Sequence, residues 1–208
     1  MLNDLTDPEI ESEREAGIKK YFPVPHITPS KIEHAVQYLK ACLSIYYSKH
    51  QKKDNFDGRM RNAMVFLAEA DRQDNNAISL SLCCTAMEAM LLRKGEPVVD
   101  KLSARTAALL EPDKRNRSDA IRFVSKRYDA RSRVLHGSTY SQSSDEKLNA
   151  RMLAAGIFKA ILERNAAIRK HGGEPNPTEF FAELDDAREN AGVILGPEES
   201  PVTSFWRT

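Results

Sequence analysis

Apolar residues recur at steps of three and four along most of this 208-residue chain, and almost no stretch alternates apolar with polar residues. The first spacing places side chains on one face of an α-helix, whereas alternation would indicate a β-strand. Long runs of alanine, leucine, glutamate, lysine and arginine also favour helices. The sequence therefore predicts an all-α protein. Its expected helices lie at about residues 31–50, 58–72, 75–93, 98–110, 117–135, 143–170 and 178–190.

Helix-stopping residues divide the chain. The three prolines of the stretch FPVPHITPS prevent a helix there, so we expect residues 1–30 to form an N-terminal arm. Gly95 and Gly172 follow the third and the sixth segment, at places where a glycine commonly ends a helix. We expect residues 31–190 to form one helical domain and residues 191–208 to form a C-terminal tail.

The third segment, residues 75–93, is apolar on nearly every side, which is typical of a central, buried helix. Glu88 is its only charged residue between Ala77 and Leu92. Because an unpaired buried charge destabilises a protein strongly, we expect this carboxylate to have a partner.

The fifth segment, residues 117–135, carries an arginine at the edge of its apolar face. That face is formed by Ile121, Val124, Tyr128 and Leu135. Arg131 falls beside these residues at about 3.6 residues per turn, so we expect its side chain to face the core or a partner. A structural ion pair with Glu88 is one interpretation of this position.

His136 follows the same segment directly and precedes Gly137. At about 100° per residue, five positions place His136 roughly 140° around a continuous helix from Arg131, so the two side chains would not meet on one helix. A glycine at this point lets the chain leave the helix and redirect the imidazole. From spacing alone, His136 is better explained by its favourable interaction with the helix dipole.

The net charge of the chain indicates no particular ligand, but one segment is locally basic. A hydrophobic content of 41% and a net charge of +1 are ordinary for a protein with one sizeable core, so any surface for nucleic acid must be a local patch. Residues 113–133 contain eight basic and three acidic residues. The phosphate backbone of a nucleic acid would be met there by Lys126, Arg127 and Arg133, although a charge-rich helix is more often a solvated face.

Other functional classes find little support in the sequence. No stretch of about 18 apolar residues is present and the N-terminus is acidic, so we expect a cytoplasmic protein without a membrane partner. The cysteines Cys42, Cys83 and Cys84 are expected to stay reduced. The chain has no glycine-rich phosphate loop and no metal-ligand spacing among its histidines, so we expect neither a metal nor a cofactor.

Three segments carry a family resemblance, namely AMEAMLL, KLSARTAALL and YDARSRVLHGS. In this order they resemble the HEPN (higher eukaryotes and prokaryotes nucleotide-binding) superfamily, in particular its ApeA-like branch. Arg131 and His136 stand at the two positions of the superfamily's R-x4-H motif, and Tyr128 and Gly137 complete the pattern as supporting residues. The resemblance covers about residues 75–162, less than half of the chain.

The resemblance implies a homodimeric bundle of about five core helices, with additional helices toward the N- and C-terminal ends. In HEPN ribonucleases, the Arg and His of both subunits meet across the dimer interface and cleave RNA without a metal ion. Arg131 and His136 would then be catalytic, with Glu88 orienting the arginine and Ser132 adding a hydrogen bond to phosphate. Such a protein would act in antiviral defence or as a toxin-like effector.

Two other interpretations fit the same residues. One is a non-catalytic HEPN module that binds RNA or a partner protein and in which Arg131 and Glu88 form a structural pair. The other is a helical scaffold whose motif match is accidental. An antitoxin or regulatory protein is a further expected partner. Toxins of the superfamily that pair with antitoxins commonly have a tyrosine two residues after the histidine, where this chain has Ser138.

Overall fold

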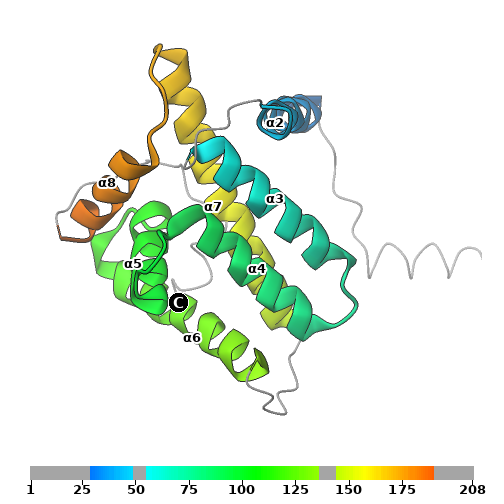
Figure 1. The fold of residues 1–208 in the computed structure, drawn as a ribbon, viewed down its shortest axis with the longest axis vertical. Helices are drawn as coiled ribbons and strands as arrows, with labels where there is room; N and C mark the ends of the chain where they lie inside the picture. The colour runs from blue at the N-terminus through cyan, green and yellow to red at the C-terminus, as the bar shows by residue number, and fades with distance from the viewer. Residues whose placement is uncertain (1–28, 49–54, 136–143, 190–208) are drawn as a thin grey trace, which may run out of the picture. The chain divides into compact units, whose positions relative to one another are not determined.

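The computed structural model describes residues 29–48, 55–135 and 144–189, and every regular element within them is a helix. These elements are α2 (Pro29–Tyr46), α3 (Phe56–Arg72), α4 (Asn76–Leu91), α5 (Val98–Leu110), the 3-10 helix η1 (Lys114–Asn116), α6 (Arg117–Leu135), α7 (Ser144–Lys170) and α8 (Pro177–Glu189) (Figure 1). The all-α prediction is confirmed, and each expected helix starts within two residues of its predicted position. The predicted tail and nearly all of the predicted arm lie outside the described residues.

The chain divides inside α2 into two units, residues 1–42 and residues 43–208. In the first unit, the apolar residues that the sequence places on one face of α2 are exposed, among them Ile32, Val36 and Leu39. The periodic apolar residues 29–42 thus form the predicted helix, with these side chains exposed in this unit.

The last turn of α2 belongs to the second unit and is anchored there by α3. Ile45 is buried, and Arg61 of α3 donates Nη2 hydrogen bonds to the carbonyl oxygens of Ile45 (3.2 Å) and Ser48 (2.6 Å). The Ile45 carbonyl also accepts from the backbone N–H of Ser48 at 3.2 Å, so Arg61 fastens the turn that follows the helix.

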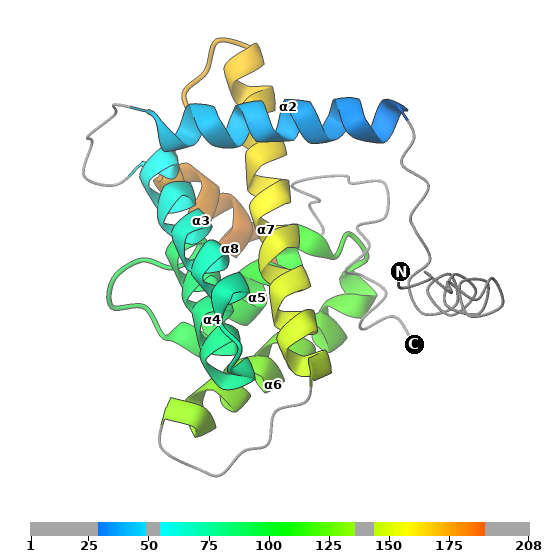
Figure 2. The same ribbon diagram turned by 90° about the vertical axis from the view of Figure 1, so that its right-hand side faces the viewer.

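Helix α4 is the central helix of the second unit, as the sequence predicts. It contacts α3, α5, α6 and α7, and α3, α4 and α7 run side by side (Figures 1 and 2). Its buried residues are Ser79, Leu80, Cys83, Cys84, Ala86, Met87, Met90 and Leu91. They lie around the whole helix because neighbouring helices cover it on several sides.

The cysteines of the described residues are free thiols. Burial raises the pKa of Cys83 to about 11 and that of Cys84 to about 12. Both thiols therefore stay protonated at neutral pH and are poor nucleophiles, because the thiolate is the reactive form.

Capping residues set the ends of the long helices. The Asn75 side chain accepts hydrogen bonds from the backbone N–H groups of Ala77 (2.9 Å) and Ile78 (3.2 Å), which caps the start of α4. Gly95 and Gly172 have φ angles of +87° and +77°. Only glycine adopts this left-handed region readily. The predicted stop at Gly172, directly after α7, is confirmed, whereas α4 ends earlier, at Leu91, through the extended Leu92, so that Gly95 serves the turn beyond it.

Candidate functional site

The Arg131 site lies where α6 packs against α4. Tyr128 and Arg131 are one helical turn apart on α6, and Glu88 comes from α4. The Tyr128 hydroxyl donates to Glu88 Oε1 (2.9 Å) and accepts from Arg131 Nη1 (2.8 Å). Arg131 Nη2 lies 3.3 Å from the same Oε1 atom. The structure thus brings together three residues that the sequence analysis names.

Partial burial strengthens these contacts. The side chains of Arg131 and Glu88 are only 20% and 24% exposed, so water screens their charges less than at an open surface. The Arg131 guanidinium carbon lies 5.0 Å from the centre of the Tyr128 ring, a distance that suits a cation–π contact. Burial of the phenol, together with its hydrogen bond to Glu88, raises the pKa of Tyr128 to about 12. The hydroxyl therefore stays protonated at neutral pH and can donate to the carboxylate.

The Arg131 guanidinium is only partly satisfied within the described residues. A guanidinium has five N–H donors, of which one on Nη1 bonds to Tyr128, while Nη2 lies 3.3 Å from Glu88 Oε1 in an ion pair. The Nε atom is buried and has no hydrogen-bond partner in the described part of the chain. The group keeps donors with which a cation can bind a phosphate oxygen.

The other predicted residues of α6 differ in exposure. Lys126 and Arg133 are exposed, and Ser132 is partly exposed beside Arg131. Arg127 instead folds back on its own helix, with its guanidinium carbon 3.3 Å from the centre of the Phe123 ring and Nη1 donating to the Phe123 carbonyl (3.2 Å). Lys126 and Arg133 are therefore the two predicted RNA-contacting cations that the structure places at the surface.

His136 and Gly137 lie outside the described residues. The described part of α6 ends at Leu135, and His136 is the next residue in the sequence.

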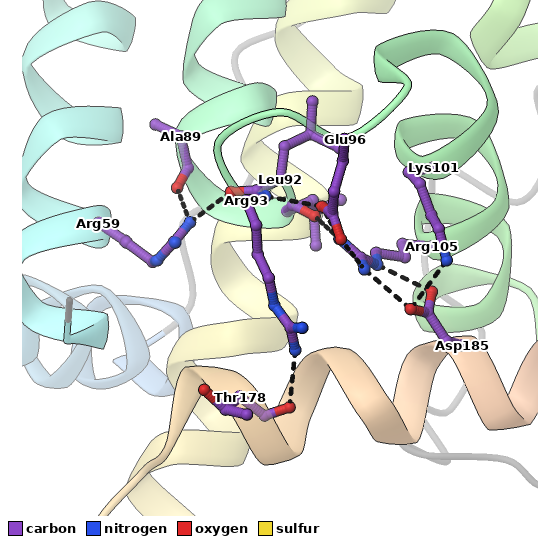
Figure 3. Close-up of polar contacts among 10 residues, drawn as sticks. Arg59, Ala89, Leu92, Arg93, Glu96, Lys101, Arg105, Thr178 and Asp185 are labelled. Carbon is purple, nitrogen blue, oxygen red and sulfur yellow. Dashed lines mark hydrogen bonds and ion pairs between the residues drawn. The ribbon is translucent and has the colours of Figure 1, made fainter.

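A second polar cluster, which the sequence analysis did not name, lies between α5, α8 and the end of α4 (Figure 3). Its centre is Arg105 of α5, whose side chain has no exposed surface. Arg105 donates two hydrogen bonds to Glu96 (2.7 and 2.8 Å), two to Asp185 (3.0 and 2.9 Å) and one to the Leu91 carbonyl (2.7 Å). Lys101 Nζ adds a 3.0 Å contact to Asp185.

The cluster continues around a buried aromatic ring of α8. The guanidinium carbons of Arg59, Arg93 and Arg105 lie 5.0, 5.0 and 4.7 Å from the centre of the Phe181 ring. Arg93 also donates to the Thr178 carbonyl (3.0 Å; Figure 3). These contacts fasten α8 to its neighbours, and we interpret the cluster as structural.

The sequence did contain a signal for this cluster. Arg105 is the only charged residue between Lys101 and Glu111, in a segment otherwise made of apolar and small residues. Glu88 stands out in its helix for the same reason. An isolated charge on an apolar helix predicts a buried partner, but the sequence does not say which residue that partner is.

Comparison of the chain with protein-family models, with curated proteins and with solved structures finds no match. Within the described residues, no three His, Cys, Asp or Glu side chains are grouped so that they could hold a metal ion. No helix in the same part of the chain is both long and apolar enough to span a membrane.

Proposed function

We propose that the protein is a metal-independent endoribonuclease of the HEPN type, acting as a cytoplasmic homodimer in antiviral defence or as a toxin-like effector. Arg131 and His136 of both subunits would form one composite site. The proposal rests on one observation above all. A partly buried Arg131 with unused donors is held by Glu88 and Tyr128 in the last turns of α6, and His136 follows that helix directly.

These residue types suit RNA cleavage by the neighbouring 2′-hydroxyl. The 2′ oxygen loses a proton and bonds to phosphorus, the bond from phosphorus to the 5′ oxygen breaks, and the departing oxygen gains a proton. Histidine titrates near neutrality, so His136 suits either proton transfer. Arg131 stays charged and stabilises the additional negative charge on the phosphate oxygens.

A dimer accounts for the spacing of the two motif residues. Five positions along a helix turn a side chain by roughly 140°, which separates Arg131 from His136 within one subunit. A two-fold axis places the same surface of both copies face to face, so that each Arg131 can approach the histidine of the other copy. The interface would then complete the site.

Exposed cations on α6 give the RNA a place to bind. Lys126 and Arg133 lie at the surface of the helix that carries Arg131. Lysine and arginine bind the phosphate backbone independently of base sequence, with an affinity that falls as salt rises. The α6 surface therefore suits the backbone of the substrate and positions it beside the motif.

A second candidate function is a non-catalytic helical module that binds RNA or a protein partner, such as an antitoxin. The contacts among Glu88, Tyr128 and Arg131 favour it, because they form within one subunit, as in a structural ion pair. Under this alternative, Arg131 would stabilise the fold and have no part in any reaction.

A cleavage assay in EDTA separates the two candidates. We expect the purified protein to cleave structured RNA without added metal, and His136→Ala to abolish cleavage because no group remains to transfer the protons. His171→Ala, which changes an exposed histidine just after α7, is the matched control and should keep full activity. Undiminished cleavage by His136→Ala, with folding and dimerisation intact, would exclude the ribonuclease proposal. RNA binding without cleavage by the wild-type protein would favour the module.

A further inference from the structure

The Tyr128 hydroxyl occupies the centre of the Arg131 site. It accepts a hydrogen bond from Arg131 Nη1 at 2.8 Å while it donates to Glu88 Oε1 at 2.9 Å. The direct approach of Arg131 Nη2 to the same carboxylate oxygen is longer, at 3.3 Å. The closest contact of the guanidinium at this site is therefore with a neutral phenol.

Removal of this hydroxyl would leave the arginine weakly held. Hydrogen bonds between a guanidinium and a carboxylate are typically about 2.7–2.9 Å long, so the 3.3 Å contact is a loose one. Arginine also has large rotamer freedom, and one long contact does not confine it to a single conformer. The Tyr128 ring, 5.0 Å from the guanidinium carbon, would remain as a broad surface without directional hydrogen bonding.

A neutral group suits this position better than a second acid would. Arg131 and Glu88 carry opposite charges, so the pair has no net charge. A carboxylate in place of the phenol would make the site negative, and it would repel a phosphate. The hydroxyl satisfies Arg131 Nη1 and links it to Glu88 without adding charge.

The geometry points to Tyr128 as a positioning residue: its hydroxyl and ring hold the Arg131 guanidinium against Glu88, so that the arginine meets the scissile phosphate of RNA in one orientation. This inference rests on the proposed ribonuclease function. A hydrogen-bond donor that is already oriented stabilises the transition state without having to move during the reaction. Such preorganised electrostatic stabilisation is usually the largest contribution to catalysis in enzymes.

The substitution Tyr128→Phe tests the inference because it removes only the hydroxyl. We expect kcat to fall about 10- to 100-fold while KM changes by less than about twofold, since a misplaced Arg131 weakens transition-state contacts more than RNA binding. Tyr47→Phe makes the same change at an exposed tyrosine and should leave both constants unaltered. An unchanged kcat, or a fall in kcat that matches the loss of folded protein, would overturn the inference.

A double substitution examines whether Tyr128 and Glu88 act as one unit. If both hold the same guanidinium, Tyr128→Phe combined with Glu88→Gln should lower kcat little more than the stronger single substitution. Independent, multiplicative effects of the two changes would contradict a shared role.

A readout without RNA distinguishes failure of this inference from failure of the proposed function. Slow rotation of a fixed guanidinium gives separate NMR signals for its terminal N–H groups, and Arg131→Lys identifies the signals of this residue. We expect them in the wild-type protein and expect Tyr128→Phe to average them. Separate signals in Tyr128→Phe would overturn the positioning role, whatever the protein does to RNA. A wild-type protein that shows the signals but cleaves no RNA would refute the ribonuclease proposal, and with it a positioning role in catalysis.

Discussion

Two arginines of this protein carry the same charge in different surroundings. Arg105 uses all five of its donors on two carboxylates and one carbonyl, and its side chain has no exposed surface. Arg131 is partly exposed and keeps unused donors within the described residues. A guanidinium whose N–H donors are all hydrogen-bonded within the protein has none for a ligand, whereas one with unused donors can bind phosphate. This difference is why we assign Arg105 to the fold and Arg131 to the candidate site.

The saturation of Arg105 predicts a large effect on stability. Arg105→Met should lower the free energy of unfolding by about 3 kcal/mol, because it leaves the Glu96 and Asp185 carboxylates partly buried without their partner. Arg115→Met is the matched control, since the Arg115 side chain is 89% exposed and its pair with Asp113 lies at the surface. That change should leave stability nearly unaltered, because an exposed ion pair contributes little to the free energy of unfolding. Urea unfolding measures both values, and equal losses in the two variants would contradict the structural role of Arg105.

Helix α8 is attached to its neighbours through arginine side chains from several elements. Arg117 of α6 donates Nη1 to the Ala187 carbonyl, and Arg164 of α7 contacts Glu183 at 2.6 Å. Phe181 adds a fully buried ring. These contacts join a short amphipathic segment to the bundle, although its sequence is acidic and resembles a solvated helix.

The Phe181 ring should therefore control how firmly α8 is held. Phe181→Ala is expected to lower the free energy of unfolding by about 3–5 kcal/mol, because it opens a cavity and removes the ring that three guanidinium groups contact. Phe181→Leu keeps most of the apolar volume and should have a clearly smaller effect. Hydrogen exchange should show the amides of α8 losing protection first in Phe181→Ala. Uniform loss of protection along the whole chain would argue against a local attachment.

Across the whole molecule, charge pairs join helices that are far apart in sequence. Arg151 contacts Asp71 at 2.7 Å, and Arg169 contacts Asp57 at 2.6 Å, so that α7 is linked twice to α3. The near balance of 31 basic and 30 acidic residues leaves little net repulsion at neutral pH. Acidification disturbs this balance, because it neutralises the carboxylates while the arginines stay charged.

The free energy of unfolding should decrease at acidic pH because Glu96 and Asp185 become protonated. Burial acts to raise the pKa of Glu96 and of Asp185. The hydrogen bonds and positive charge of Arg105, together with those of Arg93 at Glu96 and of Lys101 at Asp185, outweigh burial and lower both pKa values. The folded protein thus binds fewer protons at these groups than the unfolded chain does. The contribution of Glu96 and Asp185 to the free energy of unfolding is complete above the pKa values of the unfolded chain, about 3.9 for Asp and 4.3 for Glu. It is lost as the pH falls through the lower pKa values of the folded protein.

Thermal unfolding between pH 7 and pH 2 checks this expectation. The melting temperature should stay nearly constant down to about pH 5 and then fall. Asp185→Asn should have a lower melting temperature at neutral pH and a shallower fall in acid, because one of the titrating groups is absent. An equally steep fall in the variant would show that Asp185 does not contribute to the acid sensitivity.

The helices and the Arg131 pair were predictable from sequence, for a local reason. A helix forms through hydrogen bonds between residues four apart, and its apolar face repeats every three or four positions, so residues 98–110 and 117–135 could be read directly. Glu88 and Arg131 were recognisable because each is an isolated charge beside apolar residues. Because a buried charge needs a partner, a pair between them was one interpretation of the sequence, and the 3.3 Å contact in the structure agrees with it.

Three features depended on how the helices pack. Tyr128 was expected on the apolar face of its helix, but only the crossing of α6 and α4 shows that its hydroxyl lies between Glu88 and Arg131. Asp185 is one of several acids on α8, and no local pattern marks it as the partner of an arginine eighty positions earlier. In the last turn of α2, Leu43 and Tyr46 are exposed whereas Ile45 is buried, although Leu43 and Tyr46 continue the apolar periodicity. Local hydrogen bonding determines where a helix begins and ends, whereas contacts between distant side chains depend on helix crossings that no short stretch of sequence encodes.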